Sequence, residues 1–245
     1  MKAFENTVVS KPELVEVLEY HQLADNFIKG QYWGNGQGCG VGCSLENFTD
    51  KPNSHSEYER LFGIPRIIAI LEDGIFEGLS NEDAKWWPLA FAKSIPVGAD
   101  LSMIWPKFAI WLLADEKEGV IRHVKTDKSK ESIMDIVALY KREVDGEEFD
   151  VYEWVKARRA ANANADDADD ASYAYAYAGA KAADAGYVYA AASTNYVYAD
   201  NDTGHAYAYA DAAADDASYA YAYADKQKSR KKQADKLIEL FKSCA

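Results

Sequence analysis

Cysteine and long apolar runs are both scarce in this chain, and each scarcity excludes a class of protein. The 245 residues include only Cys39, Cys43 and Cys244, an odd number that argues against a secreted disulfide scaffold. The longest apolar runs, such as residues 108–114, are much shorter than the roughly 20 residues of a membrane-spanning helix. The first residues contain no apolar segment typical of a secretory signal. We therefore expect a cytoplasmic protein with no membrane partner.

Basic residues are almost absent from residues 160–224. The whole chain has 40 Asp and Glu against 27 Lys and Arg, a net charge of −13. Residues 160–224 hold ten Asp and one basic residue, Lys181, and so carry most of that charge. Because negative charge repels nucleic acid, we exclude direct nucleic-acid binding through this segment. The rest of the chain is closer to balance, so an anion site elsewhere stays open.

The same segment is a degenerate repeat rich in Ala, Tyr and Asp. The string DDASYAYAYA occurs at 169–178 and again at 215–224, and 12 of the 17 Tyr lie within 160–224. Strict Tyr/Ala alternation has the period of a β-strand, whereas the abundance of Ala favours helix. We predict packed helical segments, with a tyrosine-faced β meander as the alternative.

Helical periodicity runs through residues 1–159, so we predict a mainly α fold with a helical body. Ser10 is a suitable N-cap for the first helix, and Gly30 is a suitable stop. Residues 120–124 form the only run typical of a strand. Helices are expected over residues 11–29, 107–113, 128–143 and 147–159, and another between Ser54 and Gly63. Two more are expected to begin at Pro65 and at Ser80 or Asn81. Pro88 should kink or shorten the second of these.

Composition divides the chain into three predicted segments. Residues 1–159 form the body, residues 160–224 the repeat region, and residues 225–245 a basic amphipathic helix. This last segment has seven Lys and Arg between 226 and 242. Its apolar stripe consists of Leu237, Ile238, Leu240 and Phe241. Opposite charge suggests that the helix folds back onto the acidic segment.

Glycine is concentrated in residues 30–43, which hold six of the 15 in the chain. Such a density is unfavourable in a helix or a regular strand, so we expect an irregular loop. The loop has a purely structural interpretation, in which glycine permits tight turns. Alternatively, successive N–H groups form a nest for phosphate or carboxylate, although the Gly-Lys-Ser/Thr of a phosphate-binding loop is missing.

A short helix follows this loop and presents His55, Tyr58 and Glu59 on one face. These side chains either line the same pocket as the loop or simply cap and pack the helix. Further along, Glu72, Asp73 and Glu77 have the pattern of a solvated face. The candidate ligand-binding residues are Trp33, Gly38, Cys39, Gly40, Gly42, Cys43, His55, Tyr58 and Glu59.

The close pair of cysteines permits two further chemistries. Cys39 and Cys43 could join His21 or His55 in a metal site, but the second Cys pair typical of zinc sites is missing. We therefore predict no metal and no cofactor. The nucleophile hypothesis uses Cys43 with Gln37 six residues before it, a spacing found in papain-like proteases. Its base is His55 or His123, and the match covers only seven residues.

Three motifs resemble a family of bacteriophage and prophage proteins that has no assigned activity. They are Gly38-Cys-Gly-Val-Gly-Cys43, His55-Ser-x-Tyr58-Glu and residues 95–100. Members of the family similarly carry an Ala-rich repeat and a terminal segment like residues 232–240. The resemblance implies an accessory protein in the host cytoplasm.

Our leading hypothesis is a non-enzymatic binding protein of phage type. It would act on a host protein, as in counter-defence, or sequester a small anionic, nucleotide-like ligand. One alternative is a cysteine-dependent hydrolase or transferase that uses Cys43, and another is acidic mimicry of nucleic acid through 160–224. A homo-oligomer is also compatible with the sequence.

Overall fold

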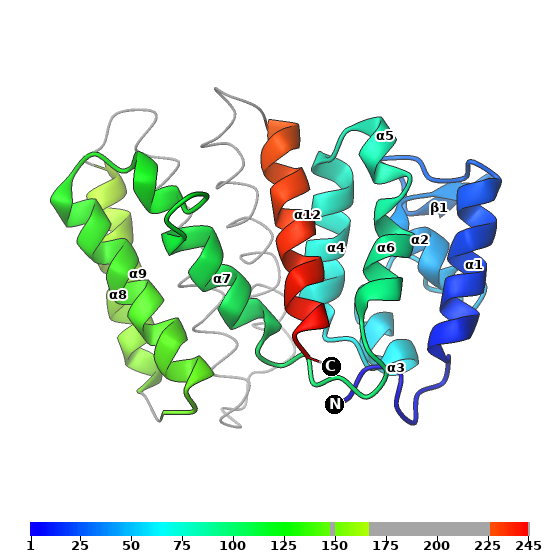
Figure 1. Ribbon diagram of the computed structural model, residues 1–245, viewed down its shortest axis with the longest axis horizontal. Helices are drawn as coiled ribbons and strands as arrows, with labels where there is room; N and C mark the ends of the chain where they lie inside the picture. The colour runs from blue at the N-terminus through cyan, green and yellow to red at the C-terminus, as the bar shows by residue number, and fades with distance from the viewer. Residues whose placement is uncertain (148–149, 167–225, 245) are drawn as a thin grey trace. The chain divides into compact units, whose positions relative to one another are not determined.

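A computed structural model describes residues 1–147, 150–166 and 226–244 (Figure 1). The chain separates into two compact units, Met1–Ile104 with Lys226–Ala245, and Trp105–Asp225. The boundary between the units falls within the predicted body, residues 1–159, and the C-terminal helix belongs to the first unit. Most of the predicted repeat region, including both copies of its repeated string, lies outside the described residues.

The fold is mainly α, as predicted. The first unit contains α1 (Lys11–Leu23), β1 (Trp33–Gly34), β2 (Gln37–Gly38), α2 (Gly40–Leu45), α3 (Glu57–Phe62), α4 (Arg66–Gly78), α5 (Asn81–Ala84), α6 (Trp87–Ser94) and α12 (Lys226–Lys242). The second contains α7 (Ile104–Ala114), which starts at the boundary, η1 (Val120–His123), α8 (Asp127–Val144) and α9 (Val151–Asp166).

Helix α1 begins as predicted and ends earlier. The Ser10 hydroxyl accepts a hydrogen bond from the N–H of Glu13, whose carboxylate accepts one from the Ser10 N–H, forming a capping box. The helix ends at Leu23 rather than at 29, because Asp25 adopts a left-handed backbone with φ of 55°. Asp tolerates that conformation better than most residues, and it breaks the helix before Gly30.

Two other helix ends follow the sequence signals, and one predicted strand is wrong. Gly63 closes α3 with a φ of 67°, and Pro65 precedes α4. Pro88 lies in the first turn of a separate helix, α6, where its missing N–H is harmless. Residues 120–123 form a 3-10 turn instead of a strand, and the only sheet in the described chain is the β1–β2 ribbon.

Helix α12 packs against α4 and α6 and completes the core of the first unit (Figure 1). Leu237 and Phe241 are fully buried, and the Phe241 ring meets Phe91 edge-on with centroids 5.4 Å apart. The predicted apolar stripe therefore contacts the helical body. The part of the acidic segment expected to receive this helix is outside the described residues.

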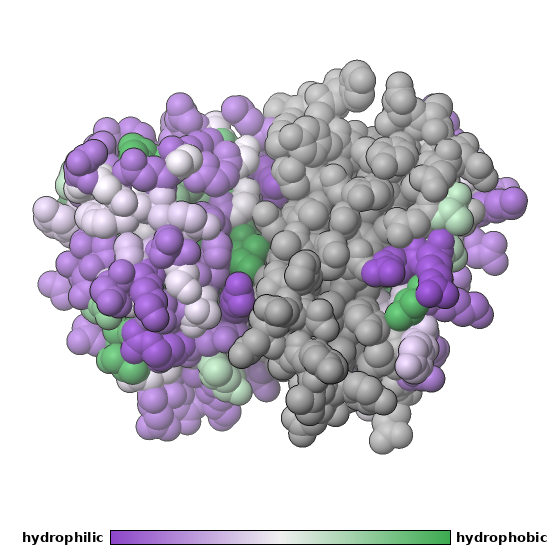
Figure 2. Space-filling model, turned by 180° about the vertical axis from the view of Figure 1, so that it is seen from behind, coloured by the Kyte–Doolittle hydropathy of each residue, from purple (hydrophilic) through white to green (hydrophobic). Residues whose placement is uncertain are grey.

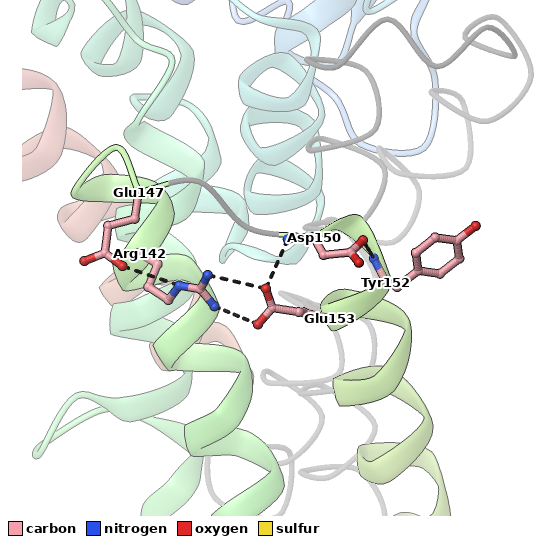
Figure 3. Close-up of polar contacts among 5 residues, drawn as sticks. All are labelled: Arg142, Glu147, Asp150, Tyr152 and Glu153. Atoms are coloured by element: carbon pink, nitrogen blue, oxygen red, sulfur yellow. Dashed lines mark hydrogen bonds and ion pairs between the residues drawn. The ribbon is translucent and has the colours of Figure 1, made fainter.

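The second unit is organised around the α8–α9 pair. The rings of Tyr140 on α8 and Trp154 on α9 meet edge-on with centroids 4.7 Å apart, and the Trp105 indole N–H donates to the Tyr140 hydroxyl at 3.1 Å. At one end of the pair, Arg142 binds the Glu153 carboxylate at 2.7 Å (Figure 3). This ion pair is partly exposed, so its contribution to stability is modest.

The surface of the first unit is mostly polar on the face seen in Figure 2, where hydrophobic side chains form small separate spots. Exposed apolar residues such as Leu23 and Val8 are scattered along the chain. None of the described helices has the length and apolar character of a membrane-crossing segment.

Candidate functional site

The glycine-rich segment is a tight hairpin followed by a buried helix, not the irregular loop that was predicted. Trp33 in β1 pairs with Gly38 in β2. Asn35 and Gly36 form the turn with φ of 53° and 80°, the conformation that an Asn-Gly pair favours in two-residue hairpins. Cys39 then caps α2, and every residue of α2 is buried.

The glycines of this segment allow backbones to approach closely. A Cβ on Gly38 or Gly42 would stand closer than 3.0 Å to the carbonyl oxygen of Tyr32, a separation that real Cβ atoms essentially never show. A Cβ on Gly40 would collide with Oε1 of Glu72 on α4 and lie 2.9 Å from Pro88. The prediction of a loop failed because these glycines serve packing, which overrides their poor helix propensity.

Two of the N–H groups proposed as an anion nest are used within the protein. The Gly38 N–H donates to the Asn26 carbonyl at 3.0 Å. The Cys39 N–H donates to the backbone carbonyls of Gln31 at 2.7 Å and Tyr32 at 3.2 Å. These two N–H groups are therefore not available to bind an anion. The nest interpretation is therefore wrong for these positions.

A cluster of chemically mixed side chains lies where the start of α2 meets α4. Sγ of Cys39 and one carboxylate oxygen each of Asp73 and Glu77 all lie within 4.8 Å of one another. Asp73 and Glu77 are four residues apart on α4, which places them on the same face. Nε2 of His55 lies 3.1 Å from Oδ2 of Asp73. We call Cys39, His55, Asp73 and Glu77 the Cys39 cluster.

His55 is positioned from two sides. Its ring meets Tyr32 edge-on with centroids 5.7 Å apart, and its imidazole contacts Asp73. Its side chain and that of Asp73 are each only 15% exposed. The hairpin residue Tyr32 and the helix residue Asp73 thus hold the imidazole at the edge of the cluster.

Glu72 lies next to the cluster and is fully buried, so the predicted solvated face is wrong at this position. Its Oε2 accepts a weak hydrogen bond of 3.4 Å from the Tyr58 hydroxyl. Its Oε1 is buried and has no hydrogen-bond partner in the described part of the chain. Burial, followed by the negative charge of Asp73, raises the pKa of Glu72 well above its ordinary value.

Tyr58 is also fully buried, so it does not line an open pocket. Burial and the neighbouring Glu72 raise the pKa of its hydroxyl. Its ring packs edge-on against Phe62 at 5.1 Å. Tyr58 therefore supports the site through packing and through its hydrogen bond to Glu72.

Cys43, Gln37 and His55 do not form the nucleophile site that their spacing suggested. Cys43 is fully buried, its Sγ–H donates to the Gly38 carbonyl at 3.5 Å, and burial raises the pKa of its thiol. Gln37 is exposed and donates to the Asp25 carbonyl, while His55 contacts Asp73. A buried thiol with a raised pKa is a poor nucleophile.

Other sequence candidates have structural roles. The Trp33 ring packs edge-on against buried His21 at 5.3 Å, and Nε2 of His21 lies 3.3 Å from Glu46. The Glu59 carboxylate accepts the Arg66 N–H at 2.9 Å and so caps α4. His123 lies in the second unit. These residues do not enter the Cys39 cluster.

Cys39 and His55 were predicted from the sequence, whereas their partners on α4 were missed. Asp73 was assigned to a solvated face, yet its side chain is only 15% exposed, whereas Glu77, assigned to the same face, is exposed. One signal was present, since Glu72 occupies the i+4 position after Ile68 and the i−3 position before Ile75, both of which are buried. An acid inside the apolar stripe of a helix indicates a buried carboxyl.

No family model, no curated protein and no solved structure matches this chain. The resemblance to phage and prophage proteins stays a prediction. The geometry of the Cys39 cluster is therefore the basis for the function proposed below.

Proposed function

We propose that the protein is a binding protein whose first unit holds a divalent cation in the Cys39 cluster. One observation carries the proposal, namely the convergence of Cys39 Sγ with the Asp73 and Glu77 carboxylates within 4.8 Å. Thiolate and carboxylate groups are established protein ligands of metal ions. This proposal replaces the sequence prediction that the protein binds no metal.

The charge of the site supports a cation over an anion. Glu72, Asp73 and Glu77 lie within one and a half turns of α4, and burial, with a smaller contribution from the negative charge of Asp73, raises the pKa of both glutamates. A cation among these groups would relieve their mutual repulsion, whereas an anion would add to it. The small anionic ligand considered from the sequence is therefore not carried forward for this site.

A binding role is also favoured over catalysis by Cys43. Burial and the charge of Glu46 both raise the pKa of that thiol. The phage context and a host-protein partner stay predictions, and both are compatible with a cation-binding accessory protein.

The test is a thermal-unfolding titration of the full-length protein after chelator treatment, using Zn²⁺, Co²⁺, Mn²⁺, Mg²⁺ and Ca²⁺ separately. A bound ion at 100 times its dissociation constant stabilises the folded state by about 2.7 kcal/mol. We expect at least one ion to raise the unfolding midpoint, and Asp73→Asn to abolish that rise. Glu16→Gln, which removes an exposed carboxylate on α1, is the matched control and should retain it.

The result that overturns the proposal is equally direct. If none of the five ions raises the midpoint and equilibrium dialysis finds none bound, the cluster is not a cation site. A rise that persists in Asp73→Asn would place the ion elsewhere in the chain.

A further inference from the structure

We infer that the ion is a thiophilic transition-metal ion of the Zn²⁺ class, bound by Cys39 as thiolate, by Asp73 and Glu77, and by His55 as the fourth ligand. This inference rests on the proposed function and names the chemistry of its ligand. It goes further by assigning His55, which at present contacts Asp73, a place in the coordination sphere.

The donor set selects the metal class. Mg²⁺ and Ca²⁺ prefer oxygen ligands and take six or more of them, counting water. Cys39, Asp73 and Glu77 offer one sulfur and two carboxylates within 4.8 Å of one another, and His55, which contacts this group through Asp73, offers one imidazole nitrogen. Sulfur and imidazole together are typical of Zn²⁺ and its neighbours in the first transition row.

The spacing of two donors already suits a four-coordinate ion. Metal–ligand bonds of about 2.0–2.1 Å in a tetrahedron place neighbouring N and O ligand atoms roughly 3.3 Å apart. Nε2 of His55 and Oδ2 of Asp73 are 3.1 Å apart. An ion could therefore bind both atoms with little change in their separation, while the Cys39 and Glu77 donors would draw inward.

A second observation points to a missing ligand at this place. Glu72 is completely buried, its Oε1 lies against Gly40 next to Cys39, and this oxygen has no hydrogen-bond partner among the residues that the structure describes. Oδ1 of Asp73 is buried and has no hydrogen-bond partner there either. Buried acceptors without donors are unfavourable, and a positive ion next to them compensates that loss.

Metal binding at this site needs no oxidant or reductant. The Cys39 Sγ–H bond breaks, its proton leaves to the buffer, and a sulfur–metal bond forms from the thiolate electron pair. The Nε2 proton that His55 donates to Asp73 leaves to solvent while Nδ1 takes one up, so the imidazole stays neutral and binds the metal through the freed Nε2 lone pair. The metal keeps its oxidation state throughout.

Co²⁺ absorption spectroscopy of the full-length chain tests the inference, because thiolate-bound Co²⁺ has a near-ultraviolet charge-transfer band and four-coordinate Co²⁺ has intense visible bands. All variants carry Cys244→Ser, so that Cys39 and Cys43 are the only thiols left in the chain. We expect both bands, and their loss on addition of Zn²⁺. Cys39→Ser should lose the charge-transfer band, while the matched control Cys43→Ser should keep it.

His55→Ala should weaken Co²⁺ binding at least about tenfold and reduce the visible bands, whereas the charge-transfer band persists at saturation. Zinc-edge X-ray absorption is measured on the protein without substitutions, so a variant that fails to fold does not affect it. It should show one sulfur at about 2.3 Å and lighter ligands at about 2.0 Å.

The outcomes separate the two proposals. If Mg²⁺ or Ca²⁺ binds at Asp73 and Co²⁺ shows no thiolate band, the cation-binding function stands and the assigned metal class is refuted. A thiolate band that survives Cys39→Ser, or a zinc spectrum without sulfur, also refutes it. If no cation binds at all, both proposals fall.

Discussion

Gly42→Ala tests whether the glycines of α2 serve close packing. A Cβ at this position would stand closer than 3.0 Å to both the carbonyl oxygen and the carbonyl carbon of Tyr32, and 3.2 Å from the Trp33 nitrogen. All three neighbours are backbone atoms, so no flexible side chain can move aside. Either the hairpin or α2 must shift.

The change in the free energy of unfolding is the balance of two opposing contributions, helix propensity and overpacking. Replacing Gly by Ala inside a helix gains up to about 1 kcal/mol from helix propensity. Overpacking of a buried site costs about 1–3 kcal/mol, and contact with rigid backbone places this case at the upper end. The shift would also strain the hydrogen bond from the Cys39 N–H to Tyr32. We expect a net loss of about 2 kcal/mol in the free energy of unfolding.

Urea unfolding followed by tryptophan fluorescence measures this loss, with Gly36→Asn as the control. Gly36 has a φ of 80°, a Cβ added to it would meet nothing within 4 Å, and Asn tolerates that backbone. The control carries backbone strain but no collision, so it should lose about 1 kcal/mol, less than Gly42→Ala. Gly42→Ala should also weaken Co²⁺ binding, since α2 carries the cap residue Cys39. An alanine variant as stable as the natural protein would refute the packing argument.

Further predictions concern helix ends and the second unit. Burial raises the pKa of Glu143 from 4.5 to about 7, so the natural protein loses stability as pH rises through that range. At roughly 1.36 kcal/mol per pKa unit, Glu143→Gln should be about 3 kcal/mol more stable at pH 8 and about equal at pH 4, by urea unfolding at each pH. Glu59→Ala removes the acceptor of the Arg66 N–H, and we expect a loss of about 1 kcal/mol by thermal unfolding. Tyr140→Phe removes the acceptor of the buried Trp105 indole N–H. It should lower stability by about 1–3 kcal/mol by urea unfolding, and an unchanged midpoint would contradict this bond.

Local signals in the sequence were sufficient for most helices. Ser10 and Glu13 form the capping box within four residues, and Gly63 and Pro65 mark adjacent helix ends through their own backbone preferences. The α8 helix, Asp127–Val144, follows its predicted range of 128–143 within one residue at each end. These features depend on neighbours in the chain, so no knowledge of the tertiary structure was needed.

The glycine segment and the acid Glu72 of α4 were misinterpreted for one shared reason. Each was judged alone, the glycines as a flexible loop and the acids as a solvated face. In the folded chain the missing Cβ of Gly40 is what leaves room for Oε1 of Glu72. The two patterns are complementary halves of one contact, and that contact brings the cap residue Cys39 to Asp73. Glycine spacing in a helix and an acid within an apolar stripe, read jointly, would have indicated this site.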